Sequence, residues 1–204
     1  MSTTTPRVRM SPDIRREQLL DLGVRLLSSR SLDELSIEML AEEAGISRGL
    51  LYHYFGNKQD FHRAVVRRAA DELIAVTAPV EEGEPLDRLA LSLEAYVDYV
   101  VANYEGYSSL VRGAASGNEA LRDIYEEARR VLTERIFETA GAEGLTELGV
   151  SDTPAARLMV RGWSAMTEEV VLNWVRDPQG VPKQELLVLL TAALPAVLSA
   201  PRTA

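Results

Sequence analysis

Apolar residues recur every three or four positions along almost the whole chain, which is the spacing of one buried face of an α-helix. No segment alternates apolar and polar residues as a half-buried strand does, and no Asn-Gly or Asp-Gly pair marks a hairpin turn. The pattern therefore predicts an all-α fold of about nine helices. Their expected positions are about 13–29, 37–44, 48–54, 58–78, 85–106, 107–115, 119–136, 154–176 and 182–199.

Capping and helix-breaking residues set these boundaries. Ser36 and Ser47 suit the N-caps of two short helices, and Gly45 between them suits the left-handed residue that ends a helix. A loose connection before residue 154 is predicted from three glycines, Gly141, Gly144 and Gly149. The first predicted helix offers an apolar face to the core, formed by Ile14, Leu19, Leu20, Leu26 and Leu27.

The composition is that of an ordinary globular protein: of 204 residues, 46% are hydrophobic and 26% are charged. The chain has no cysteine, which excludes disulfides, thiolate metal sites and cysteine nucleophiles. No apolar run approaches the roughly 20 residues of a membrane span, and the first residues lack the apolar segment of a secretory signal. We therefore expect a cytoplasmic protein without a membrane segment, a metal or another cofactor.

The net charge of −9 is unevenly distributed. Residues 1–68 carry 11 Lys and Arg against 9 Asp and Glu, whereas residues 69–204 carry 11 against 22. This difference indicates two regions with different partners, although chance variation in composition would also produce it.

The two short helices predicted at 37–44 and 48–54, joined by a turn that contains Gly45, are typical of a helix-turn-helix. Many helical proteins contain such a corner, so the spacing alone leaves the function open. The residues are more specific. The run AGISRGLLYHYFGNK at 44–58 resembles the signature of TetR/AcrR-type transcriptional regulators, A-G-V-S-x-G-x-L-Y-x-Y-F-x-x-K, with Ile46 as a conservative change.

The resemblance covers roughly residues 13–65. It implies a three-helix DNA-binding domain over 12–62 and a helical domain over 63–204 that binds a ligand and dimerises. Residues 1–11 are rich in Ser, Thr, Pro and Arg, which predicts a flexible tail. In the tail, Arg7 and Arg9 either follow a DNA minor groove or are simply disordered.

Residues around the signature both fit the family pattern and depart from it. Leu35-Ser36-Ile37 and Phe61 fit. Ser31 stands where the family often has Gly, which puts a left-handed turn there in doubt because such a turn costs more without Gly. Gly23 replaces a usual Ala, at a cost of about 1 kcal/mol in helix propensity.

A recognition helix enters the roughly 12 Å wide major groove N-terminus first, so it needs small or polar residues on its leading turn and an apolar back. Leu51 and Phe55, four residues apart, suit the apolar back. By resemblance, the family contacts DNA through the positions of Ser36, Arg48, Gly49, Tyr52, His53 and Lys58. From their place on the helix we add Ser47, Leu50 and Tyr54.

Four of these residues have a second interpretation. Arg48 either reads a guanine edge or contacts phosphate only, in which case it positions the protein without specifying a base. Leu50 is either a partly buried core residue or an apolar contact to a thymine methyl group. Tyr54 is alternatively a core aromatic residue with a hydrated hydroxyl, and His53 an ordinary exposed histidine.

The resemblance implies that the domain at 63–204 binds a small molecule. An aromatic, aliphatic and methionine stripe supports this, although plain core packing would explain about half of it. Because Glu94, Asp98 and Glu105 flank the stripe, a neutral or cationic hydrophobic ligand fits better than a polyanion. The candidate ligand contacts are Tyr96, Tyr99, Val100, Tyr107, Leu110, Val111, Tyr125, Met159, Trp163 and Met166.

The last two predicted helices are the candidates for a dimer interface. The final helix is apolar over more than the one face that a surface helix needs, and small residues on the helix before it permit a close crossing. A second chain would cover this surface, unless it is buried within one chain. The candidate interface residues are Leu158, Gly162, Ala165, Leu172, Leu186, Leu190, Leu194 and Val197.

An enzyme is the main alternative class. The run GWSAM at 162–166 lacks the closing Gly of a nucleophile elbow, and no zinc-protease, Walker or dinucleotide motif is present. A helical enzyme that uses Asp or Glu stays an alternative, whereas a purely structural or protein-interaction bundle does not account for the run at 44–58. We therefore expect a homodimeric repressor that binds a palindromic operator and is released by a small-molecule effector.

Overall fold

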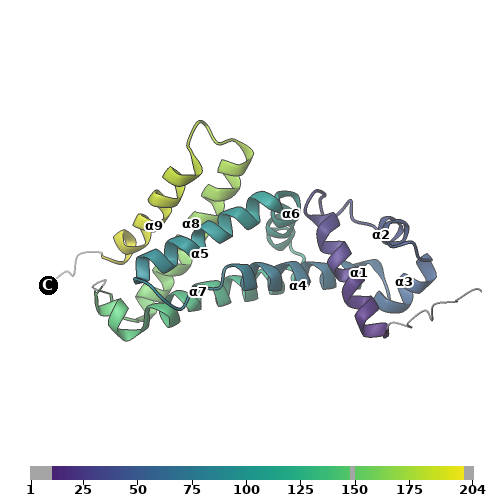
Figure 1. The fold of residues 1–204 in the computed structure, drawn as a ribbon, viewed down its shortest axis with the longest axis horizontal. Helices are drawn as coiled ribbons and strands as arrows, with labels where there is room; N and C mark the ends of the chain where they lie inside the picture. Colours follow the sequence, from purple (N-terminus) through teal and green to yellow (C-terminus); the bar gives the residue numbers. More distant parts are fainter. Residues whose placement is uncertain (1–10, 148–149, 200–204) are drawn as a thin grey trace, which may run out of the picture.

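The computed structural model describes residues 11–147 and 150–199, and within these ranges every regular element is a helix, as expected (Figure 1). Gly149 and most of the expected tail, including Arg7 and Arg9, lie outside the described residues. The helices are α1 (Pro12–Leu27), α2 (Ile37–Ala44), α3 (Arg48–Phe55), α4 (Lys58–Val76), α5 (Pro85–Ala102), α6 (Tyr104–Ala115), α7 (Glu119–Glu147), α8 (Pro154–Arg176) and α9 (Lys183–Leu198).

The molecule is elongated, with α1, α2 and α3 at one end and the antiparallel pair α8 and α9 towards the other (Figure 1). Helix α4 leads out of the first group and packs along α7, while α6 lies between α5 and α1. Because α4 is continuous across residues 62 and 63, the two expected domains share one helix. None of the helices described is both long and apolar enough to cross a membrane.

Buried residues form two clusters. One joins α1–α4 to α6 and α7 and contains Leu51 and Phe61, and the other joins α5 to α7, α8 and α9 around Val160 and Trp163. Of the core residues expected on α1, Ile14 is instead exposed, because it lies in the first turn, outside the cluster. The other four residues expected in the core are buried: Leu19, Leu20, Leu26 and Leu27.

The helix expected over 85–106 ends earlier, at Ala102. Asn103 leaves the helical conformation, and its side-chain amide donates a hydrogen bond to the Tyr99 carbonyl oxygen at 2.9 Å. The break redirects the chain so that α6 runs against α1, where a Cβ on Gly106 would lie 2.5 Å from Cγ of Leu27. Local periodicity carries no information about this contact with a distant helix.

The loose connection expected around Gly141 is largely helical in the structure. Gly141, with φ 62° and ψ −179°, breaks α7 into two consecutive helices, and the second runs on to Glu147. The second part is held by tertiary packing, because Leu145 is buried in the cluster around Trp163. Gly141 therefore marks a break between two helices, and Gly144 lies within the second helix.

The two departures from the family pattern have structural explanations. At Gly23, α1 crosses α4 so closely that a Cβ would lie 2.6 Å from Cγ2 of Val65. The loop at Ser31 needs no left-handed residue, since α1 ends at Ser28 in a right-handed conformation. Both the backbone N–H and the hydroxyl of Ser31 donate hydrogen bonds to Glu34, at 2.9 and 2.8 Å.

Candidate functional site

Hydrogen bonds between near neighbours build the unit formed by α2, the turn and α3. The Ser36 hydroxyl accepts the N–H of Met39 at 3.1 Å, and the Ser47 hydroxyl accepts the N–H of Leu50 at 3.3 Å. These are the N-caps of α2 and α3. Gly45 ends α2 in the left-handed conformation, with φ 63° and ψ 36°. The corner is therefore specified residue by residue in the chain.

Helix α3 has one buried and one exposed side. Leu51 and Phe55 point into the core, as predicted. The half-buried candidates are Ser36, whose hydroxyl caps α2, and Tyr54, which packs on the core cluster. The exposed candidates are Ser47, Arg48, Gly49, Leu50, Tyr52, His53 and, at the start of α4, Lys58. One continuous surface thus carries most of the predicted DNA contacts.

The exposed candidates have few competing contacts. Nη1 of Arg48 lies 3.9 Å from Oε1 of Glu38, a long ion pair between two exposed side chains, so the guanidinium can turn to another partner. A Cβ on Gly49 would meet nothing within 4 Å, so none of the residues that the structure describes covers this position. Leu50 is also exposed, which leaves its side chain available to a partner.

Three arginines that were not among the predicted DNA contacts lie beside α3. Arg16 of α1 and Arg63 and Arg67 of α4 line a groove together with Tyr54 and Phe55. The guanidinium of Arg16 stacks over the Phe55 ring, 5.3 Å from its centroid. The i, i+4 spacing of the arginines on α4 was visible in the sequence, but their closeness to α3 was not. Asp60 lines the same groove and pairs with Arg63 at 2.6 Å, so the groove next to the candidate DNA-binding surface keeps a net positive charge from the other two arginines.

The loop before α2 is tied to α4 by His62. Its Nε2 lies 2.6 Å from the Leu35 carbonyl oxygen, so the neutral ring donates a hydrogen bond there. Burial lowers the pKa of His62 below its ordinary value, because the charged ring would lose its hydration. The helix-turn-helix is in this way fixed to α4.

A cavity of about 180 Å³ lies among α1 and α4–α9. Its walls are mostly apolar, and the predicted ligand contacts among them are Tyr96, Tyr99, Tyr107, Leu110, Tyr125 and Trp163. Val100 is buried in the core, and neither it nor Val111 lines the cavity. Contrary to expectation, Met159 and Met166 do not line it either, because the turn of α8 puts both on the exposed outer surface.

One wall of the cavity carries a polar group of four side chains, the Tyr–Glu168 cluster: Tyr96, Tyr107, Tyr125 and Glu168. The hydroxyls of Tyr107 and Tyr125 donate to the two carboxylate oxygens of Glu168, at 2.8 and 2.7 Å. The Tyr96 and Tyr107 hydroxyl oxygens are 3.0 Å apart. Burial raises the pKa of all three tyrosines, so their hydroxyls stay protonated.

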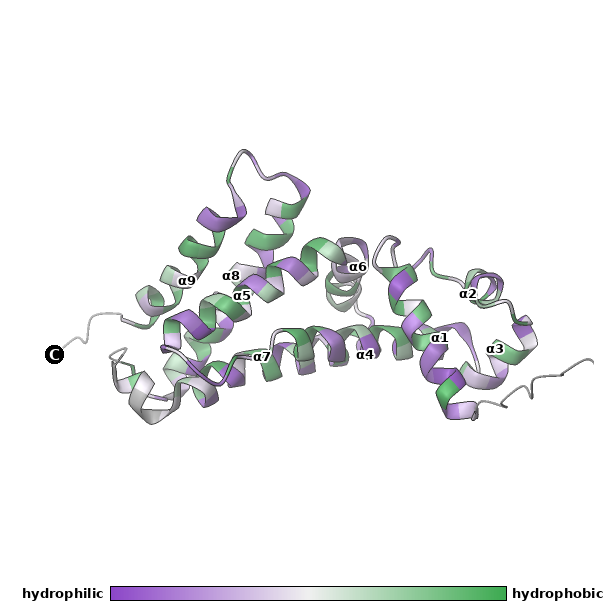
Figure 2. Cartoon of the chain, viewed as in Figure 1, coloured by the Kyte–Doolittle hydropathy of each residue, from purple (hydrophilic) through white to green (hydrophobic). Residues whose placement is uncertain are grey.

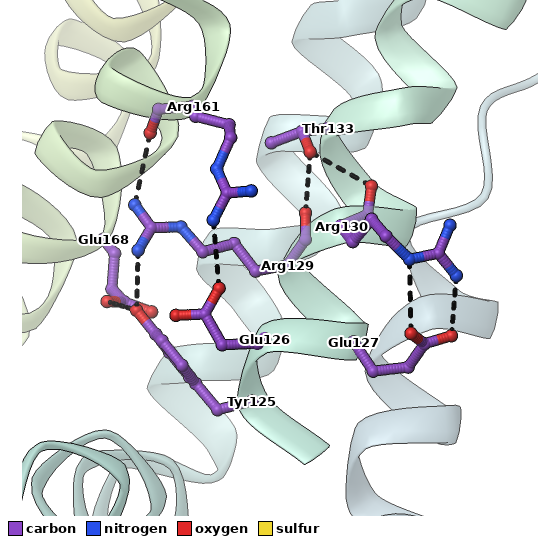
Figure 3. Close-up of polar contacts among 8 residues, drawn as sticks. All are labelled: Tyr125, Glu126, Glu127, Arg129, Arg130, Thr133, Arg161 and Glu168. Atoms are coloured by element: carbon purple, nitrogen blue, oxygen red, sulfur yellow. Dashed lines mark hydrogen bonds and ion pairs between the residues drawn. The ribbon is translucent and has the colours of Figure 1, made fainter. Parts of the chain in front are cut away.

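Arg129 lies between this cluster and the surface (Figure 3). Its Nη1 donates to the Tyr125 hydroxyl at 3.1 Å, and its Nη2 donates to the Arg161 carbonyl oxygen at 3.2 Å in an exposed hydrogen bond. The Arg161 side chain in turn pairs with Glu126 at 3.0 Å. Arg129 thus reaches Glu168 only through Tyr125.

Two further arginines line the cavity and bind backbone carbonyl groups. Arg88 donates to the carbonyl oxygens of Val80 and Thr139, at 2.7 and 3.0 Å. Arg135 donates to the carbonyl oxygen of Ile74. These bonds brace the connection between α4 and α5 against α7.

The acidic residues expected to flank the ligand lie elsewhere. Glu94 and Asp98 both pair with Lys183 of α9, at 3.1 and 2.6 Å, and neither lines the cavity. Glu105 is exposed. The carboxylate that does line the cavity, Glu168, was missed, since its spacing on α8 is that of an ordinary charged residue and only the fold brings it to the tyrosines.

Three contacts connect the cavity region to α1 and α4. The Tyr99 hydroxyl, on a cavity-lining residue, donates to the Ala69 carbonyl oxygen in α4 at 2.8 Å. Gly106 packs against Leu27 at the end of α1. The Ser109 hydroxyl accepts the N–H of Leu32, in the loop after α1, at 3.3 Å. These contacts tie α5 and α6 to the helices that hold α3.

The predicted dimer residues separate into buried and exposed groups. Contrary to expectation, Leu186, Leu190 and Leu194 are buried within the subunit, because α9 packs them against α5 and α8. Ala165, Leu172 and Val197 are half-buried.

An exposed apolar surface is nevertheless present on α8 and α9. Figure 2 shows hydrophobic residues along both helices. The exposed ones define what we call the α8–α9 face: Leu158, Met159, Gly162, Met166, Val188 and Leu189. Leu158 and Gly162 were predicted at the interface and Met159 and Met166 at the ligand, whereas Val188 and Leu189 were predicted at neither.

Comparison with known proteins agrees with this geometry. Residues 19–65 match the family described as bacterial regulatory proteins, tetR family, and residues 85–196 match the tetracyclin repressor-like C-terminal domain. A tetR-family transcriptional regulator from Streptomyces coelicolor, known from its crystal structure, is 33% identical. It superposes with a TM-score of 0.79 over 92% of this chain and 82% of its own.

More distant relatives extend over most of the chain. The HTH-type transcriptional regulator BetI of Vibrio campbellii is 23% identical over 186 residues, covering 91% of this chain and 92% of its own. The activator FasR of Mycolicibacterium smegmatis is 22% identical over 177 residues, covering 86% and 78%. FadR of Bacillus subtilis, in complex with stearoyl-CoA, shares the fold at a TM-score of 0.64 and 20% identity, covering 91% and 98%.

A capped helix-turn-helix on a helical body defines a DNA-binding transcriptional regulator and not an enzyme. The two family matches together cover most of the chain, from α1 to α9. The chain belongs to the TetR family of transcriptional regulators.

Proposed function

We propose that this protein is a homodimeric repressor, which binds a palindromic operator through α3 and is released by a small molecule bound in the cavity. The position of the cavity is the observation that supports this most. Its walls include Val24 and Leu27 of α1 and a row of residues on α4, the two helices against which the helix-turn-helix packs. A ligand there contacts the elements that set the orientation of α3.

In the proposed complex, the exposed side of α3 lies in the major groove. Arg48 leaves Glu38 and donates two hydrogen bonds to a guanine edge. Gly49 lets the backbone approach the bases. Ser47, at the N-terminus of α3, and Lys58, at the N-terminus of α4, contact phosphates.

The remaining exposed candidates suit the edges of the same groove. Tyr52 and His53 point to solvent on α3 and can reach the groove walls, and Leu50 can contact a thymine methyl group. Tyr54 and Ser36 are half-buried and contribute through their polar atoms at the periphery. Arg16, Arg63 and Arg67 extend the phosphate contacts on one side.

The proposed dimer forms through the α8–α9 face. A contiguous exposed apolar surface on a folded chain marks a site of association, and two copies of one surface associate about a two-fold axis. Such a dimer presents two α3 helices to half-sites about 34–36 Å apart, or a multiple of that distance. The operator is then a palindrome because the dimer is symmetric.

Release of the dimer from the operator follows from the difference between the ligand's affinities for two conformations, one with correctly and one with wrongly spaced α3 helices. A ligand that binds tenfold more tightly to the dimer with wrongly spaced α3 helices weakens DNA binding by the same factor, about 1.4 kcal/mol. The contacts of Tyr99 with α4 and of Gly106 with α1 carry the change to α3.

Operator selection from random DNA, followed by titration of the selected site, tests the DNA-binding part of the proposal. Arg48→Ala is expected to weaken the selected site by about 1–3 kcal/mol and to relax the preference at one base position. Arg176→Ala, an exposed arginine at the far end of α8, is the control and should bind as the unmodified protein does. Failure to select a palindrome, or an Arg48→Ala protein with unchanged affinity, would contradict it.

A reporter gene placed under the selected operator tests the direction of regulation. Lower expression in the presence of the protein supports a repressor, and higher expression would identify an activator.

A further inference from the structure

The hydrogen bonds of the Tyr–Glu168 cluster leave only acceptors unused. Tyr107 and Tyr125 donate their hydroxyl protons to Glu168. Because the Tyr107 proton is committed there, the contact between Tyr96 and Tyr107 is made by the Tyr96 proton. All three hydroxyl protons are therefore used inside the cluster. The carboxylate has about four lone-pair sites, of which two are filled, and the Tyr96 oxygen keeps its own lone pairs.

The carboxylate of Glu168 also lacks a direct counter-ion. Among the described residues, no lysine or arginine nitrogen forms an ion pair with it, and Arg129 is held away by Tyr125 and by the Arg161 carbonyl group. A carboxylate without an ion-pair partner in a mostly apolar cavity is a favourable partner for a cation, since a bound cation offsets the cost of its desolvation. The charge of Glu168 and the unused acceptors of the cluster thus both favour a cationic ligand group that donates hydrogen bonds.

A second, independent feature lies on the preceding residue, Thr167. The Thr167 side chain is 4% exposed and lines the cavity, and its hydroxyl has no hydrogen-bond partner in the described part of the chain. Buried hydroxyl groups are almost always paired, so an unpaired one at a cavity wall is expected to bind a polar atom of a ligand or a water molecule. Thr167 and Glu168 therefore mark the same end of the cavity as polar.

We propose that the effector is a hydrophobic organic amine, whose protonated nitrogen binds Glu168 and whose apolar body lies against the remaining walls. This inference rests on the proposed function, since it names the ligand class of the same cavity. Next to Glu168, an anionic head group would meet a like charge and tyrosine hydroxyls whose protons are already used, while the Arg129 guanidinium at the same wall is bonded to Tyr125 and to the Arg161 carbonyl group. The cavity volume of about 180 Å³ suits a small body, because an apolar cavity of roughly 150 Å³ holds a benzene ring.

Three probes with one body and different head groups test the inference: 4-phenylbutylamine, 4-phenylbutanol and 4-phenylbutyrate. Isothermal titration of the full chain at neutral pH is expected to give the amine the highest affinity, about tenfold or more above the alcohol, with the acid weakest. Glu168→Gln keeps the shape and removes the charge. It should weaken the amine about tenfold or more, to the level of the alcohol.

Glu169→Gln is the matched control, because Glu169 is the next residue on α8 but is exposed and bonds to Asn173. It should leave the order of the three probes unchanged. If Glu168→Gln does not fold, the order measured on the unmodified protein still decides the question. Tighter binding of the acid, equal binding of all three, no binding of any, or an amine preference that survives in folded Glu168→Gln would each overturn the inference.

These results are separable from the proposed function. Release from the operator by an anionic or neutral ligand would overturn the amine assignment and leave the ligand-responsive regulator intact. Failure of the protein to recognise an operator would contradict the proposed function without any bearing on the order of the three probes.

Discussion

Leu189 and Leu190 are neighbours on α9 with opposite surroundings. The Leu189 side chain is 60% exposed and belongs to the α8–α9 face, whereas Leu190 is 4% exposed and packs inside the subunit. The carbonyl group of Leu190 also accepts the indole N–H of Trp163 at 3.1 Å. An aspartate at each position in turn therefore tests the proposed dimer surface and the subunit core separately.

The core substitution is expected to affect folding. Leu190→Asp loses the burial of a leucine side chain, about 1.5–3 kcal/mol, and places a carboxylate without a partner in the core, at a cost of several kcal/mol more. This total is comparable with the whole stability of a typical domain, about 5–15 kcal/mol. We expect Leu190→Asp to be largely unfolded or to melt far below the unmodified protein.

The surface substitution is expected to affect association instead. In a single subunit Leu189→Asp is a surface change, worth within about 0.5 kcal/mol. In a two-fold dimer the change enters the interface twice. At about 2 kcal/mol for each copy, the dimer is weakened roughly a thousandfold.

Sedimentation velocity and circular dichroism distinguish the two effects. Leu189→Asp should sediment as a monomer that keeps its helical spectrum and a cooperative melt. Leu91→Asp is the matched control, since Leu91 of α5 is 50% exposed but lies outside the α8–α9 face, and it should stay dimeric. A Leu189→Asp protein that is as dimeric as the unmodified one would refute the placement of the interface, and a normally stable Leu190→Asp protein would refute the account of the core.

Three further predictions concern the DNA-binding end. Lys58→Ala should reduce the slope of log affinity against log salt by about one per half-site, and an unchanged slope would remove Lys58 from the phosphate contacts. Because the folded state lowers the pKa of His62, its contribution to stability is present above about pH 6.5 and is lost as the pH falls. His62→Gln cannot be protonated, but its amide can still donate a hydrogen bond to Leu35. As the pH falls from 7.5 to 5.5, the melting temperature of the unmodified protein should therefore drop further than that of His62→Gln. A difference between the two melting temperatures that does not change with pH would contradict this. Gly23→Ala should destabilise the protein by about 1–3 kcal/mol because its Cβ meets Val65. Helix propensity alone predicts the opposite, a stabilisation of about 1 kcal/mol, so a higher melting temperature for Gly23→Ala would refute the account of the close crossing.

The helix-turn-helix was predictable from the sequence because its determinants are local. Each capping bond of Ser36 and Ser47 spans three residues, and Gly45 ends α2 by its own backbone conformation. The expected bounds of 37–44 for α2 agree with the structure, and those of α3 differ by one residue. The apolar back of α3, Leu51 and Phe55, follows from helical spacing within one turn.

The other end of the molecule was less predictable because its determinants lie far apart in the chain. Gly141 alone did not show that the helix resumes beyond it, since that depends on the packing of Leu145 in a core built from four helices. Gly23 looked like a cost in helix propensity until the close crossing with Val65 was seen.

The residues of the candidate site likewise divide into those set by local sequence and those set by contacts between distant helices. The sequence by itself determined which residues α3 presents and that the C-terminal helices are rich in aromatic and aliphatic side chains. Only the tertiary structure decided which of them meet. Glu168 reaches the hydroxyls of Tyr107 and Tyr125 across 61 and 43 residues, and the rotation of α9 buries Leu190 while it exposes Leu189. Helical periodicity sets the angle between side chains on one helix, but an apolar helix such as α9 carries no signal for which side faces its own core, because that choice is made by the helices packed against it.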